Sequence, residues 1–109
     1  MFIALGDGCC LSGLYKGFRD LKELGFIEKI PHLVGVQAEG AAPIVRALRD
    51  GASRVLPGTA VTLADSIAVG SPRNWAKALR ALRESAGAGE TVTDDEILGA
   101  MRELARSAG

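Results

Sequence analysis

Histidine and cysteine are scarce in this sequence. Its 109 residues include one histidine, His32, and two cysteines, the neighbours Cys9 and Cys10. Such a set cannot supply four zinc ligands at the usual spacing, and two adjacent cysteines do not make a disulfide framework. Ser12 and Ser66 have no neighbouring histidine, so no serine-hydrolase triad is supported. Zinc sites, disulfide scaffolds and serine hydrolases are therefore not expected.

Charge of one sign and long hydrophobic runs are also missing. Thirteen basic residues balance thirteen acidic ones, which gives no sign of binding to nucleic acid or to an anionic membrane. No apolar run reaches the length of a membrane span, and the phosphate-loop motif ending in Gly-Lys-Ser/Thr is absent. We expect a cytoplasmic protein with reduced thiols, no nucleic-acid partner and no membrane partner.

What the sequence does contain is an apolar, glycine-rich composition. Hydrophobic residues make up 48% of the chain, and there are 14 glycines. This composition is typical of a globular α/β fold with tight junctions between strands and helices. Met1 leads directly into an apolar strand, and Gly109 ends a helix as glycines do before a further element. We therefore expect residues 1–109 to form part of a larger α/β fold.

Hydrophobic periodicity predicts a βαβ unit followed by further helices. Ser71 and Pro72 are suited to the N-cap and the first residue of a helix, and Thr93 with Glu96 forms a capping box. A strand or an extended linker fits residues 90–92, after a flexible turn at 86–89. The expected strands are 2–5 and 33–37, and the expected helices are 11–24, 42–50, 72–85 and one that begins after residue 93.

The loop between the first strand and the first helix is the strongest candidate site. Gly6 and Gly8 permit positive φ angles and close backbone approach. Loop N–H groups and the first N–H groups of the helix can bind a phosphate there. A plain βα turn is the alternative. A dinucleotide site, with Glu39 as the ribose acid, is a second alternative, although Leu11 replaces the third glycine of that fingerprint.

Two interpretations fit the cysteines in this loop. Helix dipoles lower the pKa of a thiol at a helix N-terminus and make it reactive. The interpretation that we favour is that Cys9 and Cys10 are small side chains that fit beneath a phosphate.

Several stretches together resemble a known family, that of threonine synthase and its close relatives among the pyridoxal-phosphate enzymes of the tryptophan synthase β-subunit fold (fold type II). The stretches are residues 6–18, 34–43, 62–67, 70–75 and 92–97. The resemblance implies an α/β fold with a partial parallel sheet (βαβ) in a three-layer arrangement, a fragment of the large domain. It implies that residues 1–109 are part of the cofactor-binding domain of a larger pyridoxal-phosphate enzyme. It also implies a cytoplasmic lyase of amino-acid biosynthesis that converts O-phosphohomoserine to threonine and phosphate.

The resemblance also implies roles for individual residues. The backbone N–H groups of Gly6, Asp7, Gly8, Cys9 and Cys10 would hold the phosphate of pyridoxal 5'-phosphate. Family loops often read Gly-Asn-Ala-Gly-Asn or Gly-Asn-Gly-Gly at this point, so Asp7 and the two cysteines depart from the pattern. A carboxylate beside a phosphate is unfavourable unless it points away or caps a neighbouring N–H group.

Other parts of the site follow from the same resemblance. Ala64, Asp65 and Ser66 are expected near the cofactor ring. The chain holds no catalytic residue, because the Schiff-base lysine is expected upstream and the residue that meets the pyridine nitrogen after position 109. We expect the fragment alone to be inactive and to self-associate, and the parent to be a homo-oligomer acting on a small amino-acid substrate.

Two alternatives to threonine synthase stay open. One is another fold type II enzyme, such as a threonine or serine dehydratase, an ammonia-lyase or a sulfur-transfer enzyme. The other is a non-catalytic α/β module that binds a phosphate or a nucleotide.

Overall fold

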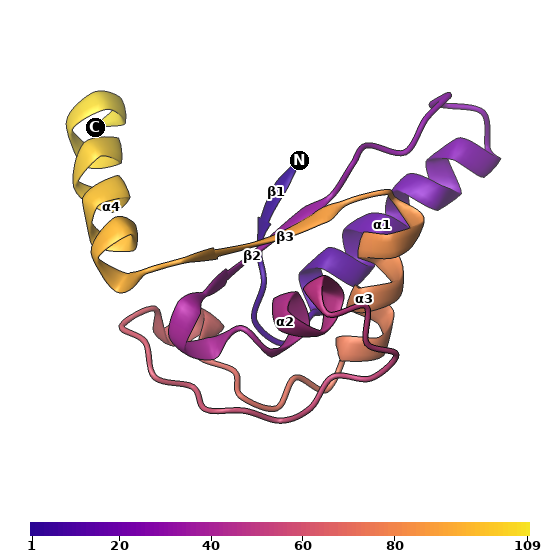
Figure 1. Cartoon of the computed structure of the whole chain (residues 1–109). Helices are drawn as coiled ribbons and strands as arrows, with labels where there is room; N and C mark the ends of the chain where they lie inside the picture. The colour runs from indigo at the N-terminus through magenta and orange to yellow at the C-terminus, as the bar shows by residue number, and fades with distance from the viewer.

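A parallel sheet of three strands forms the centre of the molecule (Figure 1). The computed structural model describes residues 1–109. The strands are β1 (Phe2–Ala4), β2 (Val34–Ala38) and β3 (Ala88–Val92), and β2 lies between the other two. This sheet confirms the expected α/β class and the parallel pairing of the first two strands. It also shows that residues 90–92 form a strand.

The third strand begins earlier than the sequence predicts. Ala88 and Gly89 fall in the expected flexible turn, yet both pair with β2. A Cβ on Gly89 would lie 3.1 Å from both methyl groups of Val45. Glycine is therefore used here for the close approach of a helix to the strand, and its presence does not indicate flexibility.

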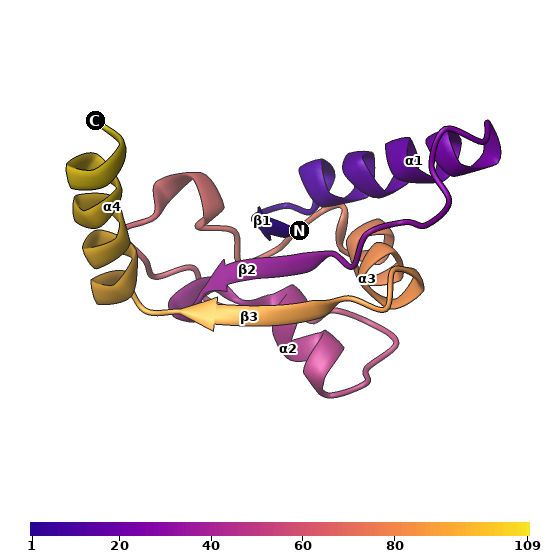
Figure 2. The same ribbon diagram turned by 90° about the horizontal axis from the view of Figure 1, so that it is seen from above.

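Three of the four helices cover one face of the sheet (Figure 2). Gly35 and Gly89 are register partners, and both face helical side chains. Phe2 and Ala88 point to the other face and are exposed. The helices are α1 (Cys9–Glu23), α2 (Pro43–Arg49), α3 (Trp75–Glu84) and α4 (Asp94–Ala108), with short 3₁₀ turns η1 (Glu39–Ala41) and η2 (Asp65–Ile67).

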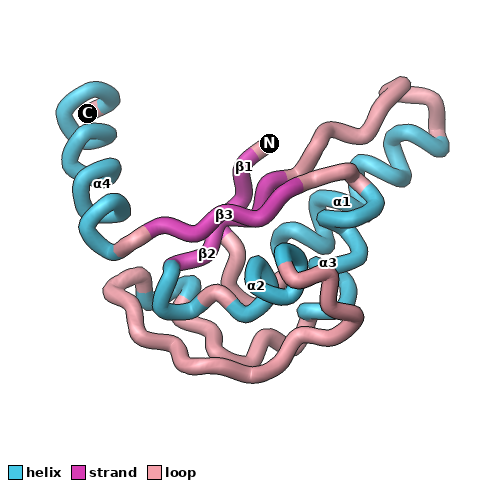
Figure 3. The backbone as a smooth tube through the Cα atoms, in the orientation of Figure 1, coloured by secondary structure: helices cyan, strands magenta, loops and turns pink.

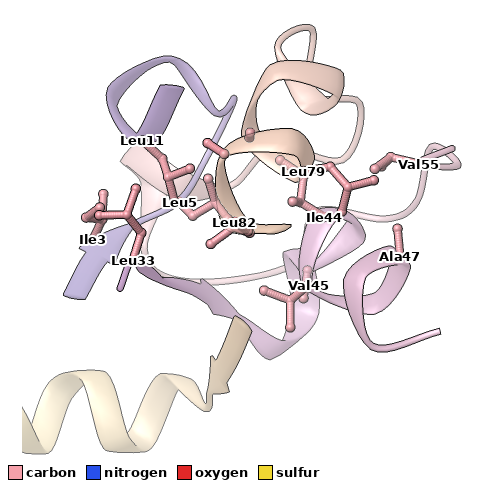
Figure 4. Packing of buried hydrophobic residues seen from close by; sticks show 13 residues of the cluster. Ile3, Leu5, Leu11, Leu33, Ile44, Val45, Ala47, Val55, Leu79 and Leu82 are labelled. Atoms are coloured by element: carbon pink, nitrogen blue, oxygen red, sulfur yellow. The ribbon is translucent and has the colours of Figure 1, made fainter. Parts of the chain in front are cut away.

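The core lies between the sheet and this helical layer (Figure 4). Leu5 and Leu11 flank the first loop and are almost fully buried, and Leu82 of α3 packs into the same cluster. Burial of these leucines on both sides of the loop fixes the junction between β1 and α1. A long loop that contains η2 runs from α2 to α3 along the helical layer (Figure 3).

The first helix starts earlier than the predicted boundary at residue 11. It begins at Cys9, because Gly8 adopts a φ of 97° and turns the chain directly into the helix. Both cysteines therefore lie in the first helical turn. At the other end Gly25 has a φ of 78°, and Phe26 N–H donates to Leu21 O at 2.9 Å, which is a glycine cap at the end of the helix.

The third helix starts later than predicted. The expected N-cap Ser71 and first residue Pro72 both precede the helix, which begins at Trp75. The reason is a long-range contact, since the backbone N–H groups of Arg73 and Asn74 are bonded to Asp7 in the first loop. The turn before α3 is thus shaped by the loop before α1.

The last helix extends away from the other three (Figure 1). Its capping box of Thr93 and Glu96 is present with both reciprocal hydrogen bonds, as predicted. None of its residues is buried, and Met101 and Leu104 on its apolar stripe are exposed. No helix in the structure has the length and apolarity that a membrane crossing requires.

Candidate functional site

A hollow of about 330 Å³ lies where β1 passes into α1. Residues 4–11 form most of its wall, and Ser66 and Ile67 of η2 also line it. The structure therefore brings together two segments that the sequence singled out separately. All five residues predicted to hold a phosphate line this hollow.

Backbone N–H groups without an acceptor are the main chemical feature of the hollow. From Gly6 to Leu11, no N–H group donates a hydrogen bond within the chain, and the first helical bond is from Ser12 N–H to Gly8 O at 3.1 Å. Gly8 and Leu11 are buried residues. The first N–H groups of a helix have no intrahelical acceptor, and here the preceding loop adds further free donors, an arrangement that can bind an anion.

The two glycines of the loop have different roles. Gly8 supplies the positive φ that begins the helix. Gly6 supplies room, because an added Cβ would lie 3.1 Å from Ser66 O and 3.2 Å from Ile67 Cα. η2 therefore packs closely against Gly6, and a side chain at Gly6 would push η2 outward.

The carboxylate of Asp7 is satisfied by the turn before α3. Its Oδ1 accepts the Arg73 N–H at 2.6 Å, and its Oδ2 accepts the Asn74 side-chain amide at 2.6 Å. These two bonds, from the Asn74 amide first and the Arg73 N–H second, lower the pKa of Asp7 below its usual value. Donors of the turn before α3 therefore stabilise the negative charge of Asp7. This arrangement allows a carboxylate to lie beside an anion site.

The structure argues against an activated thiol at Cys9. Cys9 Sγ lies 3.4 Å from Asp7 Oδ2 and accepts the Asn74 amide at 2.9 Å. The hydrogen bond to the neighbouring carboxylate raises the pKa of Cys9, because ionisation would place two negative charges side by side. The interpretation in which the helix dipole lowers this pKa is therefore wrong for Cys9. Both cysteines are free and exposed.

Of the three residues predicted near the cofactor ring, one lines the hollow. Ser66 does so, whereas Ala64 and Asp65 precede it at the start of η2, outside the lining. The segment is anchored elsewhere by Asp94, which accepts the Thr62 hydroxyl and, at 3.0 Å, the Leu63 N–H. These bonds connect the residues just before η2 to the first turn of α4.

A second hollow, of about 450 Å³, lies between α1 and α3 and is lined by four cations. The cations are Lys16, Arg19, Lys77 and Arg80. All four are exposed, and three of them pair with a carboxylate four residues further along their own helix. Such pairs are typical of a solvated helix face, so this hollow is not the candidate site.

Other polar residues fall outside the site. His32 is exposed, and its Nδ1 lies 2.9 Å from Ser85 O, which is a structural contact. Glu39 is exposed in η1, and its backbone O accepts a hydrogen bond from Arg46. No group of three or more His, Cys, Asp or Glu side chains is placed to hold a metal ion.

Sequence reasoning missed the part played by Arg73 and Asn74. Both belong to a matching stretch, but the sequence assigns neither a role at the loop. No local pattern reveals the contact, because the partners Asp7 and Arg73 lie 66 residues apart in the sequence. The one available signal is an aspartate in a loop where an uncharged amide is usual, which requires a donor from elsewhere.

The donor set and the space fit a phosphate group. Unpaired N–H groups at a helix start, a glycine with positive φ and a glycine in tight contact are the elements of an oxyanion cradle. We call residues 6–11 the cradle from here on. It contains no basic side chain, so the backbone supplies the attraction.

Comparison with known proteins gives a consistent result. The family model described as "Pyridoxal-phosphate dependent enzyme" matches residues 1–109. Threonine synthase of Methanosarcina acetivorans is 44% identical over 108 residues, and that of Methanocaldococcus jannaschii is 39% identical over 110 residues. These matches cover 98% and 100% of this chain and 27% of each relative, so the chain spans about a quarter of their length.

A solved structure shows the same fold. The crystal structure of a T.th. threonine deaminase matches with a TM-score of 0.68 and 28% sequence identity. The match covers 94% of this chain and 35% of that one. The arrangement of sheet and helices described above is thus found within a larger enzyme.

Proposed function

This chain belongs to the pyridoxal-phosphate dependent enzyme family, and on that premise we propose that its cradle binds the phosphate of the cofactor. The unpaired N–H groups from Gly6 to Leu11 support the proposal. A dianionic phosphate would accept several of these donors at the positive end of the α1 dipole. Pyridoxal phosphate, when bound, supplies the electron sink for amino-acid chemistry.

We further propose that residues 1–109 are part of the cofactor domain of a threonine synthase-like lyase. Such an enzyme converts O-phosphohomoserine to threonine and phosphate. Identities of 39% and 44% to two threonine synthases favour this reaction. The proposed cellular location of the parent protein is the cytoplasm, where the free thiols of Cys9 and Cys10 would stay reduced.

Each residue at the hollow has a proposed task in binding. The backbone of the cradle holds the phosphate, and Gly6 leaves room for it. Ser66, which also lines the hollow, would lie towards the cofactor ring, with Ala64 and Asp65 preceding it. The chain's four lysines lie on helices or in turns outside this hollow, so the amine that joins the cofactor would come from another part of the enzyme.

A threonine deaminase-like reaction is the second candidate, favoured by the structural match to such an enzyme. Both reactions would use the same cradle. The distinction lies in the substrate, whose binding residues would lie mostly in the remaining three quarters of the enzyme.

The test of the reaction pairs this chain with the missing segments, in one polypeptide or by reconstitution. With O-phosphohomoserine as substrate, we expect equal amounts of threonine and phosphate. Release of ammonia and 2-oxobutanoate from threonine, without that activity, would favour the deaminase reaction. Absence of both activities in a protein that binds the cofactor would contradict both candidates.

A further inference from the structure

The first loop contacts the turn before α3 through groups that would not themselves bind phosphate. We infer that Asp7 is a positioning residue, which holds the cradle in its anion-binding shape by anchoring it to Arg73 and Asn74. The inference rests on the proposed function, because it assigns a residue that supports the same site.

Three hydrogen bonds make the anchor. The Asp7 carboxylate accepts the Arg73 N–H and the Asn74 amide, each at 2.6 Å. The backbone O of Asp7 also accepts the Asn74 N–H at 3.2 Å. One residue of the loop is thereby held through both its side chain and its main chain.

Packing against the next residue completes the anchor. A Cβ on Gly8 would lie 3.1 Å from Asn74 O and 2.9 Å from the Cβ of Ala78. The first turn of α3 therefore presses on the residue whose positive φ begins α1. Displacement of this turn would change the direction of the N–H groups that follow Gly8.

The anchor also explains how a carboxylate is tolerated beside an anion site. Both oxygens of Asp7 accept donors of the turn before α3, and Oδ2 also accepts the Cys9 thiol at 3.4 Å. The Asn74 amide contacts Cys9 Sγ at 2.9 Å as well. The backbone N–H groups of residues 6–11 keep no acceptor within the chain. The Asp7 side chain, which departs from the usual amide of the loop, thus orients the N–H donors of the cradle and leaves them free.

The test uses 4-deoxypyridoxine phosphate, which lacks the aldehyde and cannot react with lysines, and its unphosphorylated form as the matched probe. Affinities of the 109-residue chain are measured by NMR titration for Asp7→Ala, Asn74→Asp and the exchange variant Asp7→Asn/Asn74→Asp. Asp50→Asn is the control, because Asp50 is an exposed carboxylate outside the cradle. Thermal unfolding is recorded for each variant.

We expect Asp7→Ala and Asn74→Asp to weaken binding of the phosphorylated probe by roughly tenfold, the effect of losing a hydrogen bond to a charged group. In Asn74→Asp two carboxylates face each other. The exchange variant restores a donor opposite an acceptor, so its affinity should return to within about twofold of wild type. The unphosphorylated probe should bind all variants equally.

The possible results separate the inference from the proposed function. If the wild type does not prefer the phosphorylated probe, the cradle itself is not a phosphate site. If the wild type prefers it and the two single variants do so equally well, Asp7 has no positioning role. If the single variants fail to fold, the exchange variant decides, since its failure to bind would overturn the anchor.

Discussion

The backbone of Gly8 lies directly against Ala78, so that a Cβ at Gly8 would stand 2.9 Å from the Cβ of Ala78. Gly8 also has a φ of 97°, a conformation that side chains disfavour. The start of α1 and the first turn of α3 can meet only because this residue is glycine.

Replacement of Gly8 by alanine should therefore destabilise the fold. Strain at a positive φ costs about 1–3 kcal/mol, and the contact with Ala78 adds to it. Gly17→Ala is the matched control within α1, because a Cβ there meets nothing within 4 Å. Denaturant unfolding should show a lower free energy of unfolding for Gly8→Ala and an equal or higher one for Gly17→Ala. Equal stability of Gly8→Ala and wild type would contradict the contact.

The hydroxyl of Tyr15 should control the titration of Glu84. Tyr15 donates to Glu84 Oε2 at 2.6 Å, joining α1 to α3. The pKa of Glu84 is lowered, first by this bond and second by the bond from Arg80. In Tyr15→Phe the pKa of Glu84 should rise towards its ordinary value, as measured by NMR titration of the carboxyl carbon.

The sign of the stability effect follows from that pKa. A carboxyl whose pKa is lower in the folded state stabilises the protein above its unfolded pKa, and this contribution is lost as the pH falls through the folded pKa. Tyr15→Phe should therefore lose less stability than wild type on acidification below about pH 4.3. A Glu84 titration that is identical in both proteins would show that the bond does not form in solution.

Loss of the Thr93 cap should loosen α4 selectively. Thr93 Oγ1 accepts the Glu96 N–H at 3.2 Å, and Glu96 accepts the Thr93 N–H at 2.8 Å. α4 buries none of its residues, so its first turn is held by this cap together with the bonds of Asp94 to Thr62 and Leu63. Hydrogen exchange should show roughly fivefold less protection in α4 of Thr93→Ala, the usual effect of losing a side-chain cap. Protection in α1 should be unchanged, and so should protection in the control variant Ser107→Ala.

The isolated chain should self-associate through its exposed apolar surfaces. Phe2 on the open face of the sheet is 76% exposed, and Leu104 on α4 is 65% exposed. Unpaired strand edges and exposed apolar patches favour association. Sedimentation should detect oligomers whose population falls in Met101→Lys/Leu104→Glu. Leu24→Lys is the control, because Leu24 is 71% exposed at the distant end of α1. A wild-type chain that stays monomeric would contradict the prediction.

Local patterns identified most of the fold. The capping box of Thr93 and Glu96 and the glycine cap at Gly25 are predictable because both depend on residues a few positions apart. The sequence does not predict that β3 begins at Ala88. The neighbouring Gly89 is required by a contact with α2, and no local pattern shows that contact. The sequence places the start of α3 too early, at Ser71, because the N–H groups of Arg73 and Asn74, ahead of the helix, are bonded to Asp7.

The site shows the same division. The glycines and the helix start predict the cradle, since a strand, a glycine loop and a helix follow each other directly in the sequence. The approach of Ser66 to Gly6 and the anchor formed by Asn74 are tertiary contacts. The family resemblance identifies these segments, but only the structure gives their positions relative to the cradle.

Titration of the backbone amides with a phosphate ligand tests the account most directly. Amide NMR signals of the 109-residue chain are followed as 4-deoxypyridoxine phosphate is added, with inorganic phosphate as a second probe. The account predicts that the largest shifts fall on residues 6–11, with downfield changes at the N–H groups that have no acceptor within the chain. Binding that leaves these amides unmoved, or that shifts only the cationic face between α1 and α3, would contradict it.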